Sequence, residues 1–515
     1  MKHPEWIAIL DYGSQVTQLI ARRIREQNVY CEILRYDTSA EELRINKPKG
    51  IILSGGPCSV PDKDSPRCDK EIFNLKIPIL GICYGMQLTA QILGGKVKRG
   101  EKHEYGKASM QIMNASPLYK GLKDKIQVWM SHGDKVDIIP DGFETIARSD
   151  NCVNATIQNL EKMIFGVQFH PEVIHTPDGK QMLKNFAYEI CDCNGEWEMS
   201  KFIEQTVSYV SELVSDDHVI LGLSGGVDSS VVAALLHKAI GTNLHCVYVD
   251  NGLMRHNETN EIKALFGDAF GMDLHVVNAG DIFLSKLTGI KEPEEKRKII
   301  GNTFIQVFSD KARELSLEAK YLAQGTLYPD VIESISPIGG PSATIKSHHN
   351  VGGLPDDLKF NLIEPLRELF KDEVRLVGIK LGLPDYVVNR QPFPGPGLAV
   401  RIIGEITPER IKVLQQADQI VRDEILKMDN HLDVWQYFAV LLPVQSVGVM
   451  GDDRTYENVI AVRAVESRDG MTADWFKLPY DVMDNISNRI INEVRGVNRV
   501  CYDISSKPPS TIEWE

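Results

Sequence analysis

The sequence predicts an α/β protein with two consecutive doubly wound, mostly parallel sheets, followed by a smaller α+β domain. Short apolar, β-branched runs alternate with helical patterns in the first part of the chain, and the alternation restarts further on. Such alternation is typical of βαβ units. At 515 residues the chain also exceeds what one hydrophobic core usually supports. We therefore expect domains at residues 1–195, 196–389 and 390–515.

The first domain shows this alternation from its beginning. Strand-like runs cover residues 7–10, 50–53 and 78–82, and helical patterns cover residues 15–26 and 85–93. Strands that alternate with helices at this spacing favour a parallel sheet with crossover helices.

The pattern restarts after a polar stretch at residues 191–196, which we interpret as a linker. New strands are expected at residues 218–223, 245–249, 274–277 and 321–324, with helices between them. A second α/β domain therefore begins near residue 195.

The character of the chain changes again at residues 390–397, where three prolines and two glycines exclude a regular helix. Beyond this segment the patterns predict helices at residues 406–428 and 480–494, and strands at residues 446–450, 459–465 and 499–504. This mixture indicates an α+β terminal domain.

Composition argues against several classes of protein. A formal net charge of −14 disfavours a nucleic-acid-binding surface over the whole molecule. No run reaches ~18 apolar residues, and the first residues lack the basic and apolar regions of a signal peptide. Nine cysteines at irregular spacing fit reduced thiols better than a disulfide framework. We expect a cytoplasmic protein that binds neither nucleic acid nor a membrane.

A candidate nucleophile follows the third predicted strand, in the sequence Gly81-Ile82-Cys83-Tyr84-Gly85. Small residues on both sides of a cysteine allow the strained turn that lifts a nucleophile above a sheet. The helix that follows favours the thiolate form. A buried structural cysteine is the alternative for this motif taken alone.

Two residues downstream could complete a catalytic set with Cys83. His170 could accept the thiol proton, and Glu172 could orient the imidazole and stabilise its charged form. Their spacing of two places both side chains on one face of an extended segment. A lone histidine is more often a core or surface residue, but the three residues together favour a catalytic triad.

The glycines at residues 54–57 follow a predicted strand and would let backbone N–H groups approach a developing oxyanion, although a simple βα turn is the alternative. Roughly the first 190 residues resemble a class I glutamine amidotransferase domain at three motifs: residues 54–57, 81–87 and 169–172. The resemblance implies that Cys83 forms a glutamyl thioester, His170 acts as acid and base, and Glu172 orients it. It also implies an oxyanion hole of N–H groups at Gly56 and Tyr84.

The second domain carries a candidate phosphate loop directly after a strand, with the residues Ser224, Gly225, Gly226, Val227, Asp228, Ser229 and Ser230. Backbone N–H groups and a helix N-terminus would converge there on an anion. The loop lacks the Walker ending, and an ordinary glycine-rich turn is the alternative. The full motif resembles the N-type ATP pyrophosphatases, which implies that ATP is split to AMP and pyrophosphate. Asp228 would then be a ligand for Mg²⁺, whereas Asp250 could line the nucleotide site or simply cap a turn.

The two domains in tandem, residues 390–397 and residues 507–515 together resemble the family of glutamine-hydrolysing GMP synthases over essentially the whole chain. The resemblance implies that ATP adenylates xanthosine 5′-monophosphate (XMP) and that ammonia from glutamine displaces AMP to give GMP. It further implies a homodimer formed through the C-terminal domain. The residues implied for XMP binding are Arg297, Gln436, Arg499, Lys507 and Glu513, and those implied for a lid are Lys346, His348 and His349.

Three other functions are open at this point. A tRNA-modifying pyrophosphatase would share the loop at residues 224–230 but would not need the Cys83 domain. An asparagine-forming or NAD-forming synthetase would carry a different amidase. A nucleotide-sensing interaction protein would have the folds without turnover, and the intact Cys83, His170, Glu172 and Asp228 disfavour it.

Overall fold

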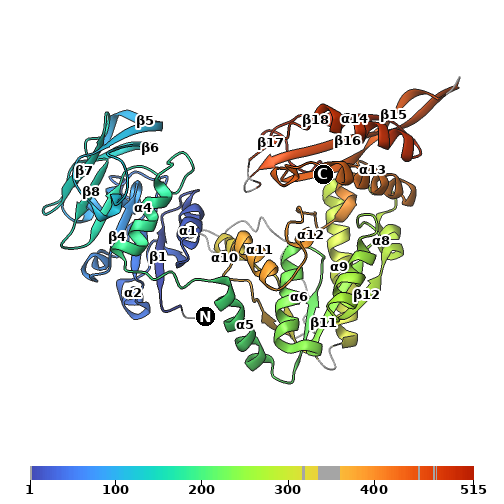
Figure 1. Cartoon of the computed structure of the whole chain (residues 1–515), viewed down its shortest axis with the longest axis horizontal. Coiled ribbons are helices and arrows are strands. Elements are labelled where there is room, and N and C mark those ends of the chain that lie inside the picture. The colour runs from blue at the N-terminus through green and yellow to red at the C-terminus, as the bar shows by residue number, and fades with distance from the viewer. Residues whose placement is uncertain (1–2, 316–318, 335–359, 451–452, 468–469, 471) are drawn as a thin grey trace. The chain divides into compact units, whose positions relative to one another are not determined.

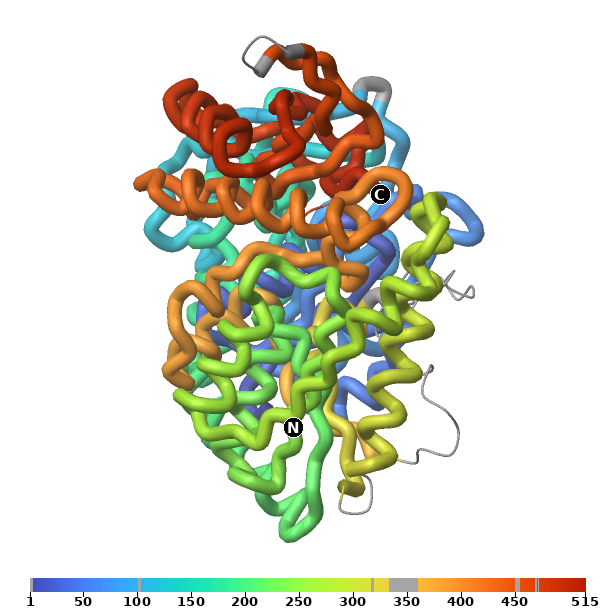
Figure 2. The backbone as a smooth tube through the Cα atoms, turned by 90° about the vertical axis from the view of Figure 1, so that its right-hand side faces the viewer, coloured from blue at the N-terminus to red at the C-terminus, as the bar shows by residue number. Residues whose placement is uncertain are grey.

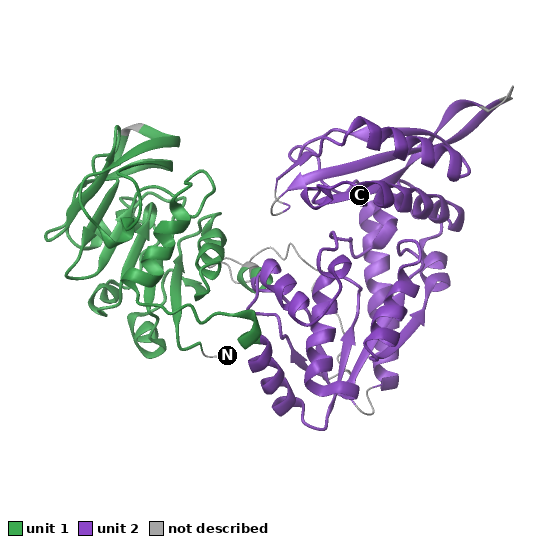
Figure 3. Ribbon diagram, viewed as in Figure 1, with its two compact units in different colours: residues 1–202, 329–345 green, residues 203–328, 346–515 purple. Residues whose placement is uncertain are grey.

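The computed structural model describes residues 3–315, 319–334, 360–450, 453–467, 470 and 472–515. The chain divides into two compact units, of which the first comprises Met1–Phe202 and the described part of Pro329–Ile345. The second comprises the described parts of Ile203–Tyr328 and Lys346–Glu515 (Figure 3). Within the described residues, no helix is long and apolar enough to cross a membrane.

The described residues of the first unit form one nine-stranded sheet in the order β2-β1-β3-β4-β9-β8-β7-β5-β6 (Figure 1). Its strands are β1 (Trp6–Asp11), β2 (Tyr30–Arg35), β3 (Gly50–Leu53), β4 (Ile79–Ile82), β5 (Lys96–Ile112), β6 (Lys125–Ile138), β7 (Glu144–Ser149), β8 (Thr156–Asn159) and β9 (Ile164–Val167). The β2-β1-β3-β4-β9 half is parallel. The other half is antiparallel.

Helices connect the parallel strands of the first unit. They are α1 (Thr17–Arg25), α2 (Ala40–Asn46), α3 (Tyr84–Ile92) and α4 (Gly179–Asn185), with the short turns η1 (Lys70–Asn74), η2 (Pro117–Tyr119) and η3 (Phe186–Ile190). Strands β1, β3, β4 and β9 are buried along their whole length, because helices cover both faces of a parallel sheet. This burial explains why their sequences are continuous apolar runs.

The second unit contains a five-stranded sheet in the order β12-β11-β10-β13-β14, and all of its pairs are parallel. Its strands are β10 (His218–Gly222), β11 (Leu244–Asp250), β12 (Asp273–Asn278), β13 (Ala319–Ala323) and β14 (Asn361–Ile363). The helices are α5 (Met199–Val214), which crosses the boundary between the units, α6 (Val227–Ile240), α7 (Glu258–Ile262), α8 (Gly280–Leu287), α9 (Pro293–Leu315), α11 (Lys371–Lys380) and α12 (Asp385–Val388), with η4 (Gly241–Asn243) and η5 (Lys263–Ala269). Helix α10 (Tyr328–Ser334) follows β13 and belongs, from Pro329 on, to the first unit. Helix α6 packs with α11 and α12, whereas α8 packs with α9.

The C-terminal segment builds a third sheet around two long antiparallel strands, β15 (Gln436–Met450) and β16 (Asp453–Ser467). The short β17 (Ala473–Trp475) and the parallel β18 (Val497–Asp503) also pair with β16. The remaining elements are α13 (Pro408–Leu426), α14 (Tyr480–Glu493), η6 (Gly397–Arg401) and η7 (His431–Asp433). Figure 2 shows this segment, in orange to red, at one end of the second unit.

One hydrophobic cluster joins the C-terminal segment to the second sheet. It includes Ile220 of β10, Phe283 of α8 and Val307 of α9 together with Leu414 of α13 and Ile460 of β16. Because these residues share one core, the C-terminal segment and the second sheet belong to one unit, while the predicted boundary at residue 390 stays a prediction.

The structure confirms the predicted fold class, and most of the predicted strands and helices lie within a few residues of their expected ends. The strands predicted at residues 446–450 and 459–465 are instead parts of the longer β15 and β16. The sequence analysis did not anticipate the antiparallel half of the first sheet, which covers residues 96–159. These strands lie partly on the surface, so their apolar residues alternate with polar ones.

Candidate functional site

Cys83 lies in the sharp turn between β4 and α3. Its backbone has a φ of 51° and a ψ of −103°, and such a conformation costs a non-glycine residue roughly 1–3 kcal/mol. A Cβ atom at Gly85 would lie 2.2 Å from the carbonyl oxygen of Leu53, and one at Gly81 would lie 2.6 Å from the amide nitrogen of Met86. The flanking glycines are therefore required by close packing of the turn.

Three of the predicted loops meet at one edge of the first sheet because β3, β4 and β9 are neighbours in its parallel half. Ser54 follows β3, Cys83 follows β4, and His170 follows β9 by a few residues. The carboxyl ends of parallel strands point the same way, so the sheet itself assembles these side chains from distant parts of the sequence.

His170 and Glu172 form a buried pair. The Nδ1 atom of His170 lies 2.7 Å from Oε1 of Glu172, and the Glu172 side chain is fully buried. The segment is held by the His170 amide, which donates to the Trp129 carbonyl at 3.0 Å, and by the Thr176 hydroxyl, which donates to the His170 carbonyl at 2.7 Å. The imidazole is thus fixed on both its ring and its backbone.

The surroundings of His170 favour its charged form. Burial opposes a charge on the ring, but the Glu172 carboxylate and the contact with Cys83 outweigh that cost. Together they raise the pKa of His170 well above its usual range. An imidazolium beside Cys83 stabilises a thiolate, which is the nucleophilic form of cysteine.

The loop after β3 lies against the same site. A Cβ atom at Gly55 would lie 3.2 Å from Cε1 of His170, and one at Gly56 would lie 3.4 Å from Cγ of Tyr84. Among the residues that the structure describes, the backbone N–H groups of Gly56 and Tyr84 donate to no acceptor. Two free donors beside the Cys83 turn suit the oxyanion of a tetrahedral intermediate.

Sequence analysis missed two contacts of the thiol. The side-chain amide of Gln168 lies 3.7 Å from the Cys83 sulfur, and the Ser131 carbonyl lies at the same distance. Gln168 stands two residues before His170 and alternates with it along the chain, which is a signal that could have identified it. Ser131 contributes only its backbone, so its residue type carries no signal.

The loop at residues 224–230 joins β10 to α6 as predicted and is held in shape by its own hydroxyl groups. Gly225 has a φ of 73°, which glycine adopts without strain. The Ser230 hydroxyl donates to the Gly226 carbonyl at 2.7 Å, and the Ser224 and Ser229 hydroxyls lie 2.9 Å apart. The loop therefore presents backbone N–H groups at the start of a helix, where an anion is stabilised.

Two basic residues that sequence analysis did not select contact this loop. Both oxygens of Asp228 accept from Nζ of Lys371, at 2.5 and 2.6 Å. Arg390 donates to the Gly225 carbonyl at 2.8 Å and also pairs with Glu258. Lys371 is the first residue of α11, where a positive charge interacts unfavourably with the helix dipole. This unfavourable position is a signal that could have identified Lys371 as a functional residue.

Asp250 acts as a cap in this structure, which was one of its two predicted roles. Its carboxylate accepts from the Gly252 amide at 2.9 Å and from the Thr259 hydroxyl at 2.6 Å. Gly325, in the loop after β13, lies close to Asp228, because a Cβ atom there would be 3.3 Å from Cβ of Asp228. The loop after β13 therefore reaches the phosphate loop.

The structure brings two of the predicted XMP-binding residues together. Nε2 of Gln436 donates to Oε1 of Glu513 at 2.7 Å. The same carboxylate accepts two hydrogen bonds from Arg401, at 2.8 and 3.1 Å. Arg297 contacts the main chain of Glu515, two residues after Glu513. Arg401 is fully buried and was not selected from the sequence.

Two other predicted XMP-binding residues make separate contacts. Arg499, on β18, donates to the Ser446 hydroxyl at 2.9 Å. Lys507 donates to the Gly470 carbonyl at 2.8 Å. The predicted lid residues Lys346, His348 and His349 lie outside the described residues.

Comparison with protein families divides the chain into three matches. The family described as glutamine amidotransferase class-I matches residues 8–190. The NAD synthase family matches residues 198–304, and the family described as GMP synthase C terminal domain matches residues 423–514. The three matches together define a class I glutamine amidotransferase domain joined to an NAD synthase-type domain and a GMP synthase C-terminal domain.

Curated relatives define the family more narrowly. The chain is 58% identical over 509 residues to the GMP synthase [glutamine-hydrolyzing] of Brachyspira hyodysenteriae, which covers 99% of each chain. It is 58% identical to the protein of the same name from Desulfotalea psychrophila, over 100% of this chain and 99% of that one. The corresponding protein of Clostridium tetani is 56% identical over 99% of each chain. This chain belongs to the glutamine-hydrolysing GMP synthase family.

Two solved structures match a limited part of the chain. A glutamine amidotransferase from Thermotoga maritima is 20% identical, with a TM-score of 0.30, and covers 37% of this chain and 99% of its own. A glutamine amidotransferase from Methylobacillus flagellatus is 18% identical, with a TM-score of 0.29, and covers 38% of this chain and 93% of its own.

Proposed function

We propose that this enzyme makes GMP from XMP, ATP and glutamine, with ammonia released at Cys83 and consumed beside the loop at residues 224–230. The observation that carries the proposal is the strained cysteine turn beside the buried His170–Glu172 pair, in a chain that also holds a pyrophosphate-type loop. The proposed reaction needs both sites, one to release ammonia and one to activate XMP.

At the first site, the Cys83 thiolate attacks the carboxamide carbon of glutamine. The oxygen of the resulting tetrahedral intermediate accepts hydrogen bonds from the N–H groups of Gly56 and Tyr84. His170 then gives its proton to the leaving nitrogen, so ammonia departs and a glutamyl thioester remains. Water, deprotonated by His170, hydrolyses the thioester to glutamate and releases the Cys83 thiolate beside the protonated His170. Glu172 keeps the ring oriented throughout.

At the second site, the 2-oxygen of XMP attacks the α-phosphorus of ATP and pyrophosphate leaves. Ammonia then adds to C2 of the adenylyl-XMP intermediate, and AMP departs with the former 2-oxygen, leaving GMP. The loop at residues 224–230 would hold the leaving pyrophosphate with its N–H groups and hydroxyls. Activation is needed because an amide-type oxygen leaves poorly until it carries a phosphoryl group.

Mg²⁺ fits this site, because the Asp228 carboxylate lies at the phosphate loop and already attracts the ammonium of Lys371. Asp228 would hold the ion, which when bound would neutralise charge on the phosphate oxygens. Lys371 could then turn from the carboxylate to a phosphate oxygen.

We assign XMP to the site that includes Gln436 and Glu513, with Arg297, Arg499 and Lys507 as further ligands and Lys346, His348 and His349 as lid residues. The bond between Gln436 and Glu513 supports a shared role for these two side chains. Because Arg401 occupies the Glu513 carboxylate from the buried side, we assign Arg401 to positioning Glu513 for the nucleotide.

The chain acts as a cytoplasmic homodimer in this proposal, with domains at residues 1–195, 196–389 and 390–515. The far half of the β15–β16 hairpin exposes apolar side chains, among them Val447, Val449 and Tyr456, and extends beyond the rest of the second unit (Figure 1). A second copy of the chain would cover them.

Sedimentation of the Val449→Asp variant should give a lighter species than the wild type, because the new charge would disrupt the proposed interface. An unchanged mass would show that the hairpin is not part of the interface.

The experiment that tests the division of labour is Cys83→Ala. Glutamine-dependent GMP synthesis should fall by on the order of 10⁴-fold or more, because the covalent nucleophile is lost. Synthesis from added ammonium should continue near the wild-type rate. Loss of both activities in a folded variant would show that the two sites do not divide the reaction in this way.

A further inference from the structure

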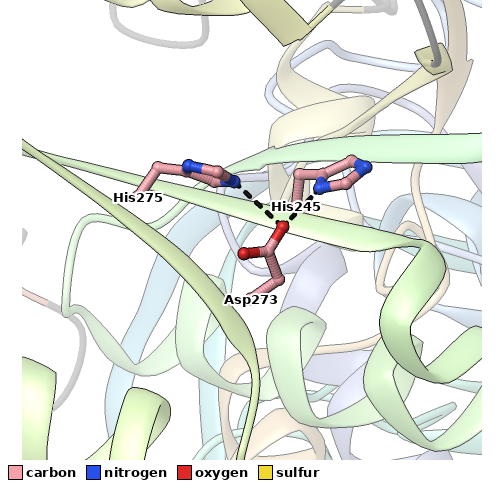
Figure 4. Close-up of side chains that lie close together, drawn as sticks. All are labelled: His245, Asp273 and His275. Carbon is pink, nitrogen blue, oxygen red and sulfur yellow. Dashed lines mark hydrogen bonds and ion pairs between the residues drawn. The ribbon is translucent and has the colours of Figure 1, made fainter.

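Three metal-ligating side chains converge at the edge of the second sheet that lies away from the phosphate loop. They are His245 on β11 and Asp273 and His275 on β12 (Figure 4). Nδ1 of His245 lies 2.5 Å from Oδ2 of Asp273, and Nε2 of His275 lies 2.9 Å from the same oxygen. Among the described residues, this is the group whose ligand atoms all lie within 4.8 Å of one another.

The sheet fixes this arrangement. His245 pairs directly with Asp273 across the parallel β11–β12 ladder. Asp273 and His275 are two residues apart on one strand, so their side chains point to the same face. The cluster therefore does not depend on a loop, and rigid elements hold ligands more accurately than loops do.

The cluster is separate from the site of ATP chemistry. His245 and Asp273 lie at the beginnings of their strands, whereas the loop at residues 224–230 follows the end of β10. The neighbouring strands are parallel, so beginnings and ends lie at opposite edges of the sheet.

A fourth residue supports His245 from behind. Nδ1 of His218, at the start of β10, lies 2.9 Å from Nε2 of His245, and the two rings are stacked at 5.0 Å. A histidine that binds a metal through one nitrogen usually gives its other N–H to an acceptor, which fixes the tautomer. If His245 carries its proton on Nε2 and donates it to His218, Nδ1 can exchange its present contact with Asp273 for a bond to a metal.

We propose that His245, Asp273 and His275 bind a divalent transition metal of the Zn²⁺ type. Two imidazoles and one carboxylate are ligands that such ions take, and they are a poor match for Mg²⁺, which prefers oxygen alone. A tetrahedral zinc ion with bonds of ~2.0–2.2 Å spaces its ligand atoms by roughly 3.3 Å. The separations of 2.5 and 2.9 Å from Oδ2 of Asp273 would open to this spacing by side-chain rotation, and water would complete the fourth position.

The ion would join β11 to β12 and so stabilise the outer edge of this sheet. Strand β12 is the edge strand, and its residues are mostly half-buried. A ligand that binds only the folded state stabilises it, by an amount that grows with the logarithm of ligand concentration over its dissociation constant, and so raises the unfolding temperature. The site is thus assigned a structural role, distinct from the proposed catalysis.

The test is a titration of metal-free, full-length protein with Zn²⁺ and with Co²⁺, compared with Asp273→Asn and His275→Asn. His256→Asn is the matched control, because His256 is an exposed histidine of the same unit outside the cluster. The wild type and His256→Asn should each bind one more equivalent of metal than Asp273→Asn and His275→Asn. Zn²⁺ should raise the midpoint of thermal unfolding of the wild type and of His256→Asn, but not of the two cluster variants.

The absorption spectrum of bound Co²⁺ distinguishes metal at this cluster from metal bound by cysteine thiols. Cys58 and Cys501 are exposed thiols that could also take metal, but a thiolate ligand produces a charge-transfer absorption band that imidazole and carboxylate do not. The absorption spectrum of the additional Co²⁺ ion should lack the thiolate charge-transfer band, as expected for nitrogen and oxygen ligands. Equal metal binding by the wild type and both cluster variants, or an additional ion bound only through sulfur, would overturn the proposal.

Discussion

The two sites of this chain are built in opposite ways. At the first, strain and burial prepare the chemistry before any substrate arrives: Cys83 has a positive φ, and Glu172 is fully buried against His170. At the second, the charged groups are half-exposed and neutralise one another, as Asp228 and Lys371 do. In the proposed mechanism the first site uses a nucleophile that is fixed in place, whereas the second exchanges ion pairs when a polyphosphate binds.

The difference follows from the two reactions. A thioester step needs one nucleophile held against one acid–base pair, so a fixed arrangement in a low-dielectric environment is favourable. Binding of a polyanion replaces existing ion pairs with new ones, so Asp228 and Lys371 must remain free to exchange partners. Substitutions should therefore affect the rate of the chemical step at the first site and both nucleotide binding and rate at the second.

The largest effect beyond loss of the nucleophile is expected for Asp228→Asn. GMP formation should fall about 10³-fold with both glutamine and ammonium, because charge stabilisation at the phosphates is lost. Labelling of Cys83 by an electrophilic glutamine analogue should persist, which serves as the folding control. A variant that lost only glutamine-dependent synthesis would remove Asp228 from the ATP site.

A smaller effect is expected for Glu172→Gln, which should lower the glutamine-dependent rate about 10²-fold. Glu172 helps to raise the pKa of His170, so the imidazolium persists to higher pH in the wild type. Without the carboxylate this pKa falls, and the alkaline limb of the glutamine-dependent pH profile should move to lower pH. An unmoved limb would contradict the assigned role, and the ammonium-dependent rate at fixed pH should match the wild type.

The smallest effect is expected for Lys371→Ala, which should raise the KM for ATP about tenfold through loss of one charge-assisted contact. The matched control is Lys380→Ala, because Lys380 is exposed at the other end of α11. Steady-state kinetics with ammonium as the nitrogen donor separate this effect from the first site. Equal ATP KM values for the two variants would show that Lys371 only balances the charge of Asp228.

Local patterns in the sequence predicted much of this molecule because the residues of both candidate sites lie in turns directly after strands. The turns at Cys83 and at residues 224–230 each combine a strand, glycines and a helix start, so one short window contains the whole signal. The buried strands were equally clear, since both of their faces are apolar.

Contacts between distant residues were not predictable in the same way. Lys371 and Asp228 are 143 positions apart, and Arg401 and Glu513 are 112 apart. Such pairs depend on how sheets and helices pack, which no single window encodes. The His245–Asp273–His275 cluster was missed for the same reason, because it needs the register of two strands.

The most direct test of the whole account uses XMP labelled with ¹⁸O at its 2-oxygen, together with ATP, Mg²⁺ and either glutamine or ammonium. The account predicts equal amounts of AMP and GMP with either nitrogen donor, pyrophosphate as the other product, and the label in the phosphate of AMP. Formation of ADP, or GMP accompanied by unlabelled AMP, would contradict activation of XMP by adenylation.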